Sequence, residues 1–328
     1  MKKFIDIAND LRLRLAEFGD SAESKALIES AVATNQWFTP REVGRSVEAI
    51  CTQMLDTGKL SEWLAHYPTL PAQKARRVAI IMAGNIPLVG FFDLLCALAA
   101  GHQAWIKPSS KDRVLMDYIC QTLRQIEPGI PIYIYDEQLS YDAIIATGGE
   151  AANKYFEHKF ANTRRICRGN RHSIAVLAGD ENLDDMQLLA KDIYSYSGLG
   201  CRNVAMIFAP KGYKVQLPQK NVGEKYYNNY LQNKALHTMH GGDFIDTGSS
   251  ILLRSQHLPT SLSTISVWEY DSLEQVERWI NEHDNELQCV VSHSIDHPRR
   301  VEFGAAQQPT LWDYADGVDT MHFLEFKS

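Results

Sequence analysis

The sequence lacks several features that mark particular protein classes. Its six cysteines are scattered and form no Cys-x-x-Cys pair, so neither a disulfide framework nor a metal site is expected, and a cytoplasmic location fits best. Acidic residues outnumber basic ones by 40 to 33, which gives a net charge of −7. A protein that binds nucleic acid needs a broad basic face, so nucleic acid is not expected as the main partner of this chain.

Long apolar runs are also missing. The most apolar stretch, residues 86–100, is short and contains Asp93. It therefore predicts a core helix and no membrane span. Asp6 and Asp10 interrupt the N-terminal segment, so no signal peptide is expected.

The composition is that of a globular protein. Hydrophobic residues make up 45% and charged residues 22% of 328 residues, which predicts two domains with a sizeable core. From Val78 onward, short apolar runs alternate with helical patterns, and glycines mark the turns. This alternation predicts α/β units with parallel sheets, whose ligands lie at the carboxyl ends of the strands. The predicted strands are 78–83, 104–106, 132–135, 143–146, 174–177, 204–208, 251–253, 265–270 and 290–291, and the predicted helices are 4–18, 43–55, 88–100, 114–126, 183–196, 226–236 and 273–283.

One cysteine lies where a nucleophile could act. Cys201 follows Gly198 and Gly200 in a predicted loop between a helix and a strand, where the backbone can approach a substrate closely. A thiolate there could attack a carbonyl carbon, and Arg202 beside it could help to hold the negative charge. The alternative interpretation is a buried structural thiol.

Three further motifs lie at the predicted ends of strands. Asn85 could donate its amide to an oxyanion or could cap a helix. Lys107 could reach a ribose or a phosphate, or could be a solvated lysine in a turn. The segment Thr147-Gly148-Gly149 could cradle a phosphate, although the full G-x-G-x-x-G fingerprint is missing.

Taken in order, these motifs resemble the aldehyde dehydrogenase superfamily. Residues 85–87, 97–101 and 107–109 resemble its Asn-Phe-Pro, Ala-Leu-Ala-Ala-Gly-Asn and Lys-Pro-Ser run. Residues 147–149 resemble its Thr-Gly-Ser turn, and Gly198-x-x-Cys201 resembles its Gly-Gln-x-Cys segment. The resemblance extends from about Val78 to His293.

The resemblance implies an aldehyde dehydrogenase-like α/β fold with a Rossmann-type cofactor domain and an α/β catalytic domain. It implies a nucleophile at Cys201 and an oxyanion hole formed by Asn85 and the Cys201 N–H. It implies a nicotinamide cofactor held by Lys107, Ser109, Ser110, Lys111, Thr147, Gly148 and Gly149. The expected segments are a helical region packing on the cofactor domain (1–70), the cofactor domain (71–166), the catalytic domain (167–300) and a C-terminal tail (301–328).

Departures from the family pattern narrow the expected activity. Hydrolytic members carry a glutamate base in a Glu-Leu-Gly-Gly-Lys segment, and Cys167 occupies that place here. Without a carboxylate, activating water on a thioester is difficult, whereas hydride could reduce the acyl-enzyme to an aldehyde. The chain therefore looks most similar to the acyl-CoA reductases, including the fatty acyl reductases of bacterial bioluminescence. The Glu-x-Phe-Gly-Pro segment is also missing, and Pro259–Ser263 stands in its place.

Two charged features bear on the ligands. Ser110-Lys111 stands where NAD-preferring relatives often carry a glutamate, which favours NADPH over NADH by Coulomb attraction to a 2′-phosphate. Arg165, Arg168 and Arg171 lie in the densest basic cluster of the chain. They could bind the phosphates of coenzyme A or an acidic acyl carrier protein, or they could pair with acids along a hinge strand.

The sequence therefore predicts the reduction of an acyl-CoA or acyl carrier protein thioester to an aldehyde. Two alternatives remain open: an aldehyde oxidiser whose base lies elsewhere, and a non-catalytic cofactor-binding scaffold. A homo-oligomer is possible because the superfamily usually oligomerises.

Overall fold

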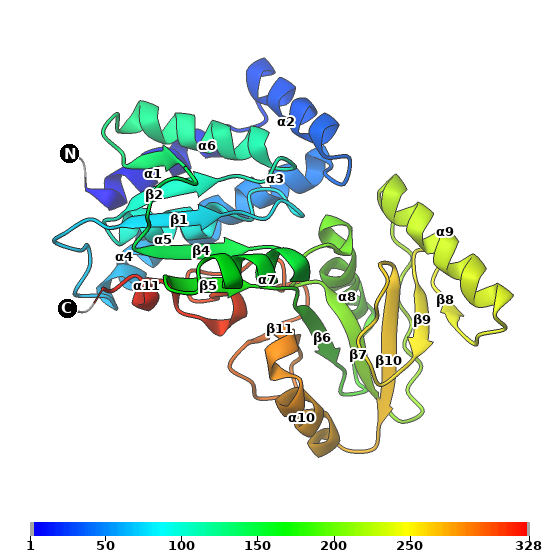
Figure 1. The fold of residues 1–328 in the computed structure, drawn as a ribbon. Helices are drawn as coiled ribbons and strands as arrows, with labels where there is room; N and C mark the ends of the chain where they lie inside the picture. Colours follow the sequence, from blue (N-terminus) through cyan, green and yellow to red (C-terminus); the bar gives the residue numbers. More distant parts are fainter. Residues whose placement is uncertain (1–2, 327–328) are drawn as a thin grey trace. The chain divides into compact units, whose positions relative to one another are not determined.

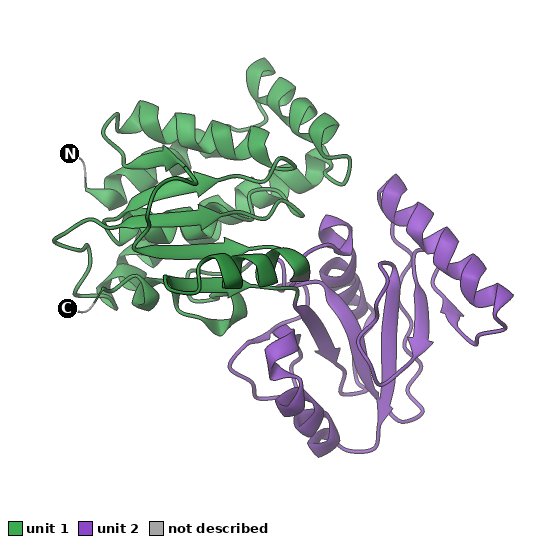
Figure 2. Ribbon diagram, in the orientation of Figure 1, with its two compact units in different colours: residues 1–170, 309–328 green, residues 171–308 purple. Residues whose placement is uncertain are grey.

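The computed structural model describes residues 3–326 and divides into two compact units. Unit 1 comprises residues up to 170 together with those from 309 onward, and unit 2 comprises residues 171–308 (Figure 2). The expected boundaries differ from this division. Residue 167 lies in strand β5 (Arg164–Arg168), which pairs with a strand of unit 1. The end of the expected tail returns to unit 1 because its apolar residues Leu311, Met321 and Leu324 belong to the core of that unit.

Unit 1 is built on a parallel five-stranded sheet with the order β3-β2-β1-β4-β5 (Figure 1). Each neighbouring pair is parallel, as the alternation of strands and helices predicts. The strand β1 lies in the centre and buries four of its five residues, which explains its continuous apolar sequence. The bounds of these strands are Arg77–Ile81 for β1, Gln103–Lys107 for β2, Ile132–Ile134 for β3 and Ala143–Thr147 for β4.

The helices of unit 1 share one hydrophobic core with its sheet. Helix α5 buries eight of its nine residues, including Leu94. Leu11 and Trp63 from the N-terminal region belong to the same core, so this region packs on the sheet. The helices are α1 (Phe4–Ala16), α2 (Ala22–Thr34), α3 (Pro40–Ala49), a π-helical turn (Ile50–Met54), α4 (Thr57–Ala65), α5 (Phe91–Ala99), α6 (Arg113–Ile126), α7 (Glu150–Lys159) and α11 (Thr320–Phe323).

Unit 2 contains a second sheet, with the order β12-β11-β6-β7-β10-β9-β8. The short edge strand β8 runs antiparallel to β9, and the other pairs are parallel. The strands are β6 (His172–Val176), β7 (Val204–Pro210), β8 (Ile245–Asp246), β9 (Ile251–Arg254), β10 (Thr264–Tyr270), β11 (Leu287–Val291) and β12 (Arg300–Val301).

Three helices accompany the sheet of unit 2. Helix α10 (Leu273–Glu282) places Val276 and Trp279 in a core cluster with Phe208 and Val290 of the strands. The other helices are α8 (Leu183–Tyr194) and α9 (Glu224–Met239). Among the helices described in either unit, none combines the length and the apolar character needed to cross a membrane.

Candidate active site

Asn85 lies in the loop that joins β1 to α5. Its side chain is exposed, and helix α5 begins only at Phe91 with Gly90 in the capping position. Asn85 therefore does not cap this helix, which was the alternative interpretation of the motif. The loop is held by side chains from other elements: the Asn35 amide donates to the carbonyl of Gly84 at 3.2 Å, and the Ser46 hydroxyl donates to that of Pro87 at 2.7 Å.

A buried carboxyl group fixes the next part of the same loop. The Leu88 N–H donates to Oδ2 of Asp112 at 2.8 Å, and Leu88 adopts a left-handed conformation with φ of 58°. Burial raises the pKa of Asp112 to about 8, although the hydrogen bond from Leu88 opposes this shift. Its other oxygen, Oδ1, has no hydrogen-bond partner within residues 3–326. Asp112 thus links the Asn85 loop to the loop that follows β2.

The loops after β1 and β2 approach each other closely. A β-carbon on Gly84 would lie 2.6 Å from the β-carbon of Ser109, so only glycine fits there without a shift of the backbone. Lys107 ends β2, and its Nζ lies 3.7 Å from a carboxylate oxygen of Glu137, with both side chains more than half exposed. Ser110 and Lys111 are exposed on the same loop.

The third predicted cofactor motif follows β4, the neighbour of β1 on its other side. Gly148 packs so tightly that a β-carbon would lie 2.9 Å from that of Ala152. Gly149 is the N-cap of α7, and within the described chain a β-carbon there would meet no atom within 4 Å. The space beside Gly149 is therefore open next to the start of α7, and the first N–H groups of a helix favour an anion. The Asn85, Lys107 and Thr147 motifs thus lie at the carboxyl ends of three adjacent parallel strands.

The predicted arginines occupy different environments. Arg165 is exposed and donates to the carbonyls of Phe160 and Ala161. Arg171 belongs to unit 2 and donates to the carbonyl of Leu287 at 2.9 Å. The basic cluster is therefore not one continuous strand of exposed arginines.

Arg168 requires a correction, because it does not lie on a substrate-binding surface. It is 4% exposed, and its Nη1 contacts both carboxylate oxygens of Asp93 at 2.8 and 2.7 Å. Its Nη2 donates to the Thr320 hydroxyl at 2.9 Å. Both Nη atoms are used by these buried contacts, while Nε has no hydrogen-bond partner within residues 3–326. Arg168 therefore neutralises a buried carboxylate in the interior of unit 1 and is not available to a substrate.

Cys201 lies at the corner of a tight turn in unit 2. The N–H of Asn203 donates to the carbonyl of Gly200 at 3.0 Å, and the N–H of Gly200 donates to Oδ1 of Asn203 at 2.8 Å. Residues 200–203 thus form a β-turn with Cys201 as its first central residue. The Ser173 hydroxyl of β6 donates to the Cys201 carbonyl at 2.9 Å. Cys201 itself is half-buried.

The chain reaches this turn through three consecutive left-handed residues. Tyr196, Ser197 and Gly198 have φ values of 53°, 54° and 65°. For a residue with a β-carbon this conformation costs roughly 1–2 kcal/mol, so Tyr196 and Ser197 must be held in place by their surroundings.

The side chain of Asn203 provides part of the support for this left-handed segment, a role that the sequence analysis did not predict. Asn203 is 4% exposed. Its Nδ2 lies 2.9, 3.1 and 2.8 Å from the carbonyl oxygens of Asp192, Ile193 and Ser195, so its two N–H donors are shared among three carbonyls. Asp192 and Ile193 are in the last turn of helix α8 and Ser195 is its C-cap, where carbonyls have no intrahelical partners. The sequence feature that could have indicated this role is the position of an asparagine two residues after the candidate nucleophile, at the junction between a helix and a strand.

A cavity of about 160 Å³ lies beside the Cys201 turn within unit 2. Gly198, Gly200 and Asn203 line one part of it, and residues 259–265 line another. The latter include the segment that replaces the expected Glu-x-Phe-Gly-Pro motif. His172 also lines the cavity, and burial lowers its pKa.

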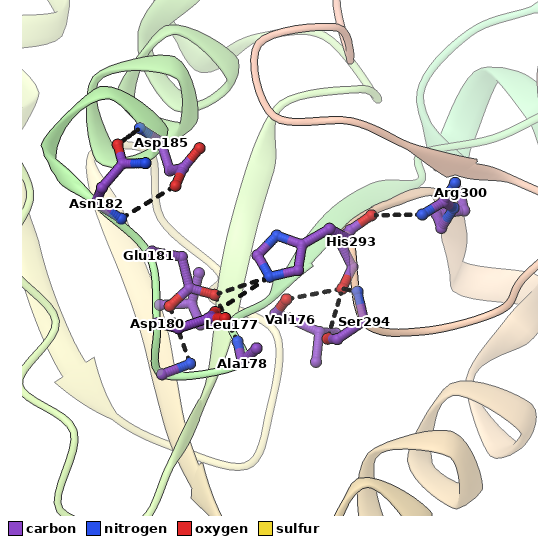
Figure 3. A network of polar contacts seen from close by, with 12 residues as sticks. Val176, Leu177, Ala178, Asp180, Glu181, Asn182, Asp185, His293, Ser294 and Arg300 are labelled. Carbon is purple, nitrogen blue, oxygen red and sulfur yellow. Dashed lines mark hydrogen bonds and ion pairs between the residues drawn. The ribbon is translucent and has the colours of Figure 1, made fainter.

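One group of side chains in residues 3–326 has ligand atoms close enough to hold a metal ion: Asp180, Glu181 and His293. His293 Nε2 lies 3.3 Å from Asp180 and 4.0 Å from Glu181 (Figure 3). The Glu181 carboxylate already accepts hydrogen bonds from the N–H groups of Ala178 and Gly179. These contacts explain the close approach of the three side chains as a link between the loops that follow β6 and β11.

The sequence profile of the family described as acyl-CoA reductase (LuxC) matches residues 22–222, which is more than half of the chain. The chain belongs to this acyl-CoA reductase family. The matched region contains the Asn85, Lys107, Thr147 and Cys201 motifs, and membership confirms the resemblance inferred from them. The chain is accordingly an enzyme of the acyl-CoA reductase kind, with chemistry that links acyl groups and aldehydes.

Solved structures of aldehyde dehydrogenases share the fold. An acetylating aldehyde dehydrogenase from Geobacillus thermoglucosidasius is 11% identical, with a TM-score of 0.63 over 98% of this chain and 89% of that one. An aldehyde dehydrogenase from Mycobacterium tuberculosis, in complex with NAD+, is 14% identical, with a TM-score of 0.60 over 89% and 73%. A comparison with curated proteins found no match. The aldehyde dehydrogenase-like α/β fold is thus confirmed.

Proposed function

We propose that this reductase converts an acyl thioester to an aldehyde with NADPH, through an acyl group held on Cys201. The observation that carries the proposal is the placement of Cys201, the nucleophile implied by the family resemblance, at the corner of a turn clamped by Asn203. Glycines border the turn, and a cavity lies beside it. Cys201 itself is not among the residues that line this cavity, and its half-buried thiol is assigned to the substrate carbonyl from the family resemblance.

The chemistry begins at the sulfur of Cys201. Its thiolate attacks the thioester carbonyl carbon, the bond to the departing thiol breaks, and that thiol leaves as a thiolate that takes up a proton. We assign the Cys201 N–H to the negative charge that develops on the carbonyl oxygen. For Asn85 we keep the oxyanion role that the family resemblance implies. The result is a thioester between the acyl group and Cys201.

Reduction, and not hydrolysis, completes the proposed reaction. The place of the hydrolytic glutamate is occupied by Cys167, on strand β5, and burial raises the pKa of that thiol. A neutral thiol is a poor base for activating water. The bound nicotinamide would supply hydride to the acyl carbon, after which the carbon–sulfur bond to Cys201 breaks and the aldehyde is released.

The cofactor-binding residues are proposed on unit 1. The close approach of Gly84 to Ser109 and the open start of helix α7 suit an extended dinucleotide lying over the carboxyl ends of β1, β2 and β4. Lys107 would reach a ribose, and Thr147, Gly148 and Gly149 would lie along the pyrophosphate. Lys111, with Ser110 beside it, supports NADPH because it offers a positive charge to the 2′-phosphate.

The acyl donor is proposed to be acyl-CoA or an acyl carrier protein. Arg165 is exposed on β5 of unit 1, and we assign it to the phosphates of coenzyme A or the acidic surface of a carrier protein. Arg171 of unit 2 is proposed separately for the same class of ligand. Arg168 is left out of this assignment because Asp93 holds it in the interior.

The decisive experiment replaces the sulfur. The wild type, Cys201→Ala and the control Cys51→Ala are incubated with NADPH and a panel of acyl-CoA thioesters while nicotinamide absorbance is followed. We expect Cys201→Ala to lose at least about 1,000-fold in turnover with unchanged cofactor affinity, and Cys51→Ala to keep its activity. Intact mass should show an acyl adduct on the wild type when NADPH is omitted. Substantial turnover by Cys201→Ala would refute the assignment.

Two further assays separate the alternatives. An aldehyde oxidiser without thioester chemistry would oxidise aldehydes equally well with and without coenzyme A. A scaffold would give neither turnover nor an acyl adduct. For the cofactor, Lys111→Glu should raise the KM for NADPH about tenfold while leaving that for NADH nearly unchanged.

A further inference from the structure

Helix α8, the left-handed segment that follows it and the Cys201 turn are joined by one side chain. The two N–H donors of the Asn203 amide are shared among three carbonyls near the end of α8, and its oxygen accepts from the N–H of Gly200. Its backbone N–H closes the turn at Gly200. Every polar atom of the Asn203 amide group is thus used, and each contact lies on one side or the other of the left-handed segment.

We infer that Asn203 is a positioning residue for Cys201, whose side chain holds the left-handed segment Tyr196–Gly198 and so fixes the backbone corner that presents the sulfur. This inference rests on the proposed role of Cys201 as the nucleophile. Asn203 itself is buried and touches no reacting atom in this role. It acts through the backbone of the turn.

The geometry explains why an amide is needed. The carbonyls at the end of α8 require donors, and the Gly200 N–H requires an acceptor. Asparagine offers both on one short planar group. Aspartate would retain the acceptor but place a negative oxygen against three carbonyl oxygens, and alanine would provide neither. Because two residues with β-carbons are left-handed here, loss of the amide removes contacts on both sides of this segment that help to hold it.

The test compares variants at the two ends of helix α8. Asn203→Ala removes the contacts beside Cys201. Asn182→Ala is the matched control, because the Asn182 side chain caps the other end of the same helix and accepts from the N–H groups of Asp184 and Asp185. Both variants should lower the melting temperature, and Asn203→Ala by more, because it leaves buried backbone groups without a partner, whereas Asn182 is an exposed cap.

The expected kinetic results differ. Asn203→Ala should lower kcat for acyl thioester reduction about 100-fold, the scale of a misplaced reacting group, with cofactor affinity unchanged. Asn182→Ala should keep kcat within about twofold. In the double variant Asn203→Ala/Ser197→Gly, glycine adopts the left-handed conformation without penalty, so part of the lost kcat should return. A kcat near that of the wild type for Asn203→Ala, or equal losses in both single variants, would overturn the inference.

A substrate-free measurement keeps this inference separate from the proposed function. The rate at which iodoacetamide alkylates Cys201 is followed by peptide mass spectrometry, with Cys51 as the internal reference. If Asn203 positions the thiol, Asn203→Ala changes the Cys201 rate but not the Cys51 rate, even if the chain proves to reduce no thioester. An unchanged Cys201 rate would refute the positioning role. Should Asn203→Ala not fold, the double variant is compared with Ser197→Gly in both assays.

Discussion

The buried carboxyl group of Asp112 gives a prediction that can be worked out in detail. Burial raises its pKa from 3.8 to about 8 in the folded protein. The folded state therefore binds one more proton than the unfolded state between these two pH values. Its stability must fall as the pH rises through this window.

The change that exposes this effect is Asp112→Asn, which keeps an oxygen for the Leu88 N–H but cannot ionise. One pKa unit corresponds to about 1.4 kcal/mol. Between about pH 5 and pH 7, the wild type should lose up to about 3 kcal/mol of unfolding free energy relative to Asp112→Asn. Below about pH 3 the two proteins should differ mainly by a constant offset, because the carboxyl group is then protonated in both states.

The assay is urea unfolding of both proteins at a series of pH values. The matched control is Asp117→Asn, which removes a partly exposed carboxylate on the same helix and should run nearly parallel to the wild type. If the free energies of the wild type and Asp112→Asn followed the same pH dependence, Asp112 would be ionised in the folded protein, and the account of the buried link to the Asn85 loop would be wrong.

Two further substitutions test buried charges. Arg168→Met should lower the free energy of unfolding, measured in urea, by about 3–5 kcal/mol, because the carboxylate of Asp93 is left buried without its partner. Adding Asp93→Leu should recover much of this loss. A loss below about 1 kcal/mol for the single variant would contradict the ion pair. Asp192→Ala should lower the free energy of unfolding by about 2–4 kcal/mol, since the N–H groups of Gly304 and Ala306 lose their acceptor. Amide hydrogen exchange at these two positions should become faster. Unchanged protection there would count against the contact.

The parallel sheets could be predicted because their signals are local. The run Val78–Ala83 is apolar throughout and ends at a glycine, which is typical of a strand buried on both faces, and β1 lies there. Lys107 and Thr147 were expected at the ends of strands, and they end β2 and β4. Helix α2 was missed, since its residues alternate between small and charged without a clear apolar stripe.

The fate of individual side chains was harder to predict because their partners are distant or are backbone atoms. Arg168 belongs to a basic cluster in sequence, but Asp93, which buries it, lies 75 residues away. Arg165 and Arg168 are three residues apart on β5 and therefore face opposite sides of the sheet; the first is exposed and the second is buried. Asn203 contacts carbonyl groups of the main chain. Because every residue has such a group, the sequence does not indicate which carbonyls the side chain will contact.

The return of the last segment to unit 1 affects how the protein is made. Leu311, Tyr314, Met321 and Leu324 complete a core whose other members lie before residue 150. During synthesis, unit 2 emerges whole from the ribosome before this final piece of unit 1 does, so the order of folding need not follow the order of the chain. A nascent chain halted near residue 300 would expose the apolar surface that these residues cover, and is therefore expected to bind chaperones until translation resumes.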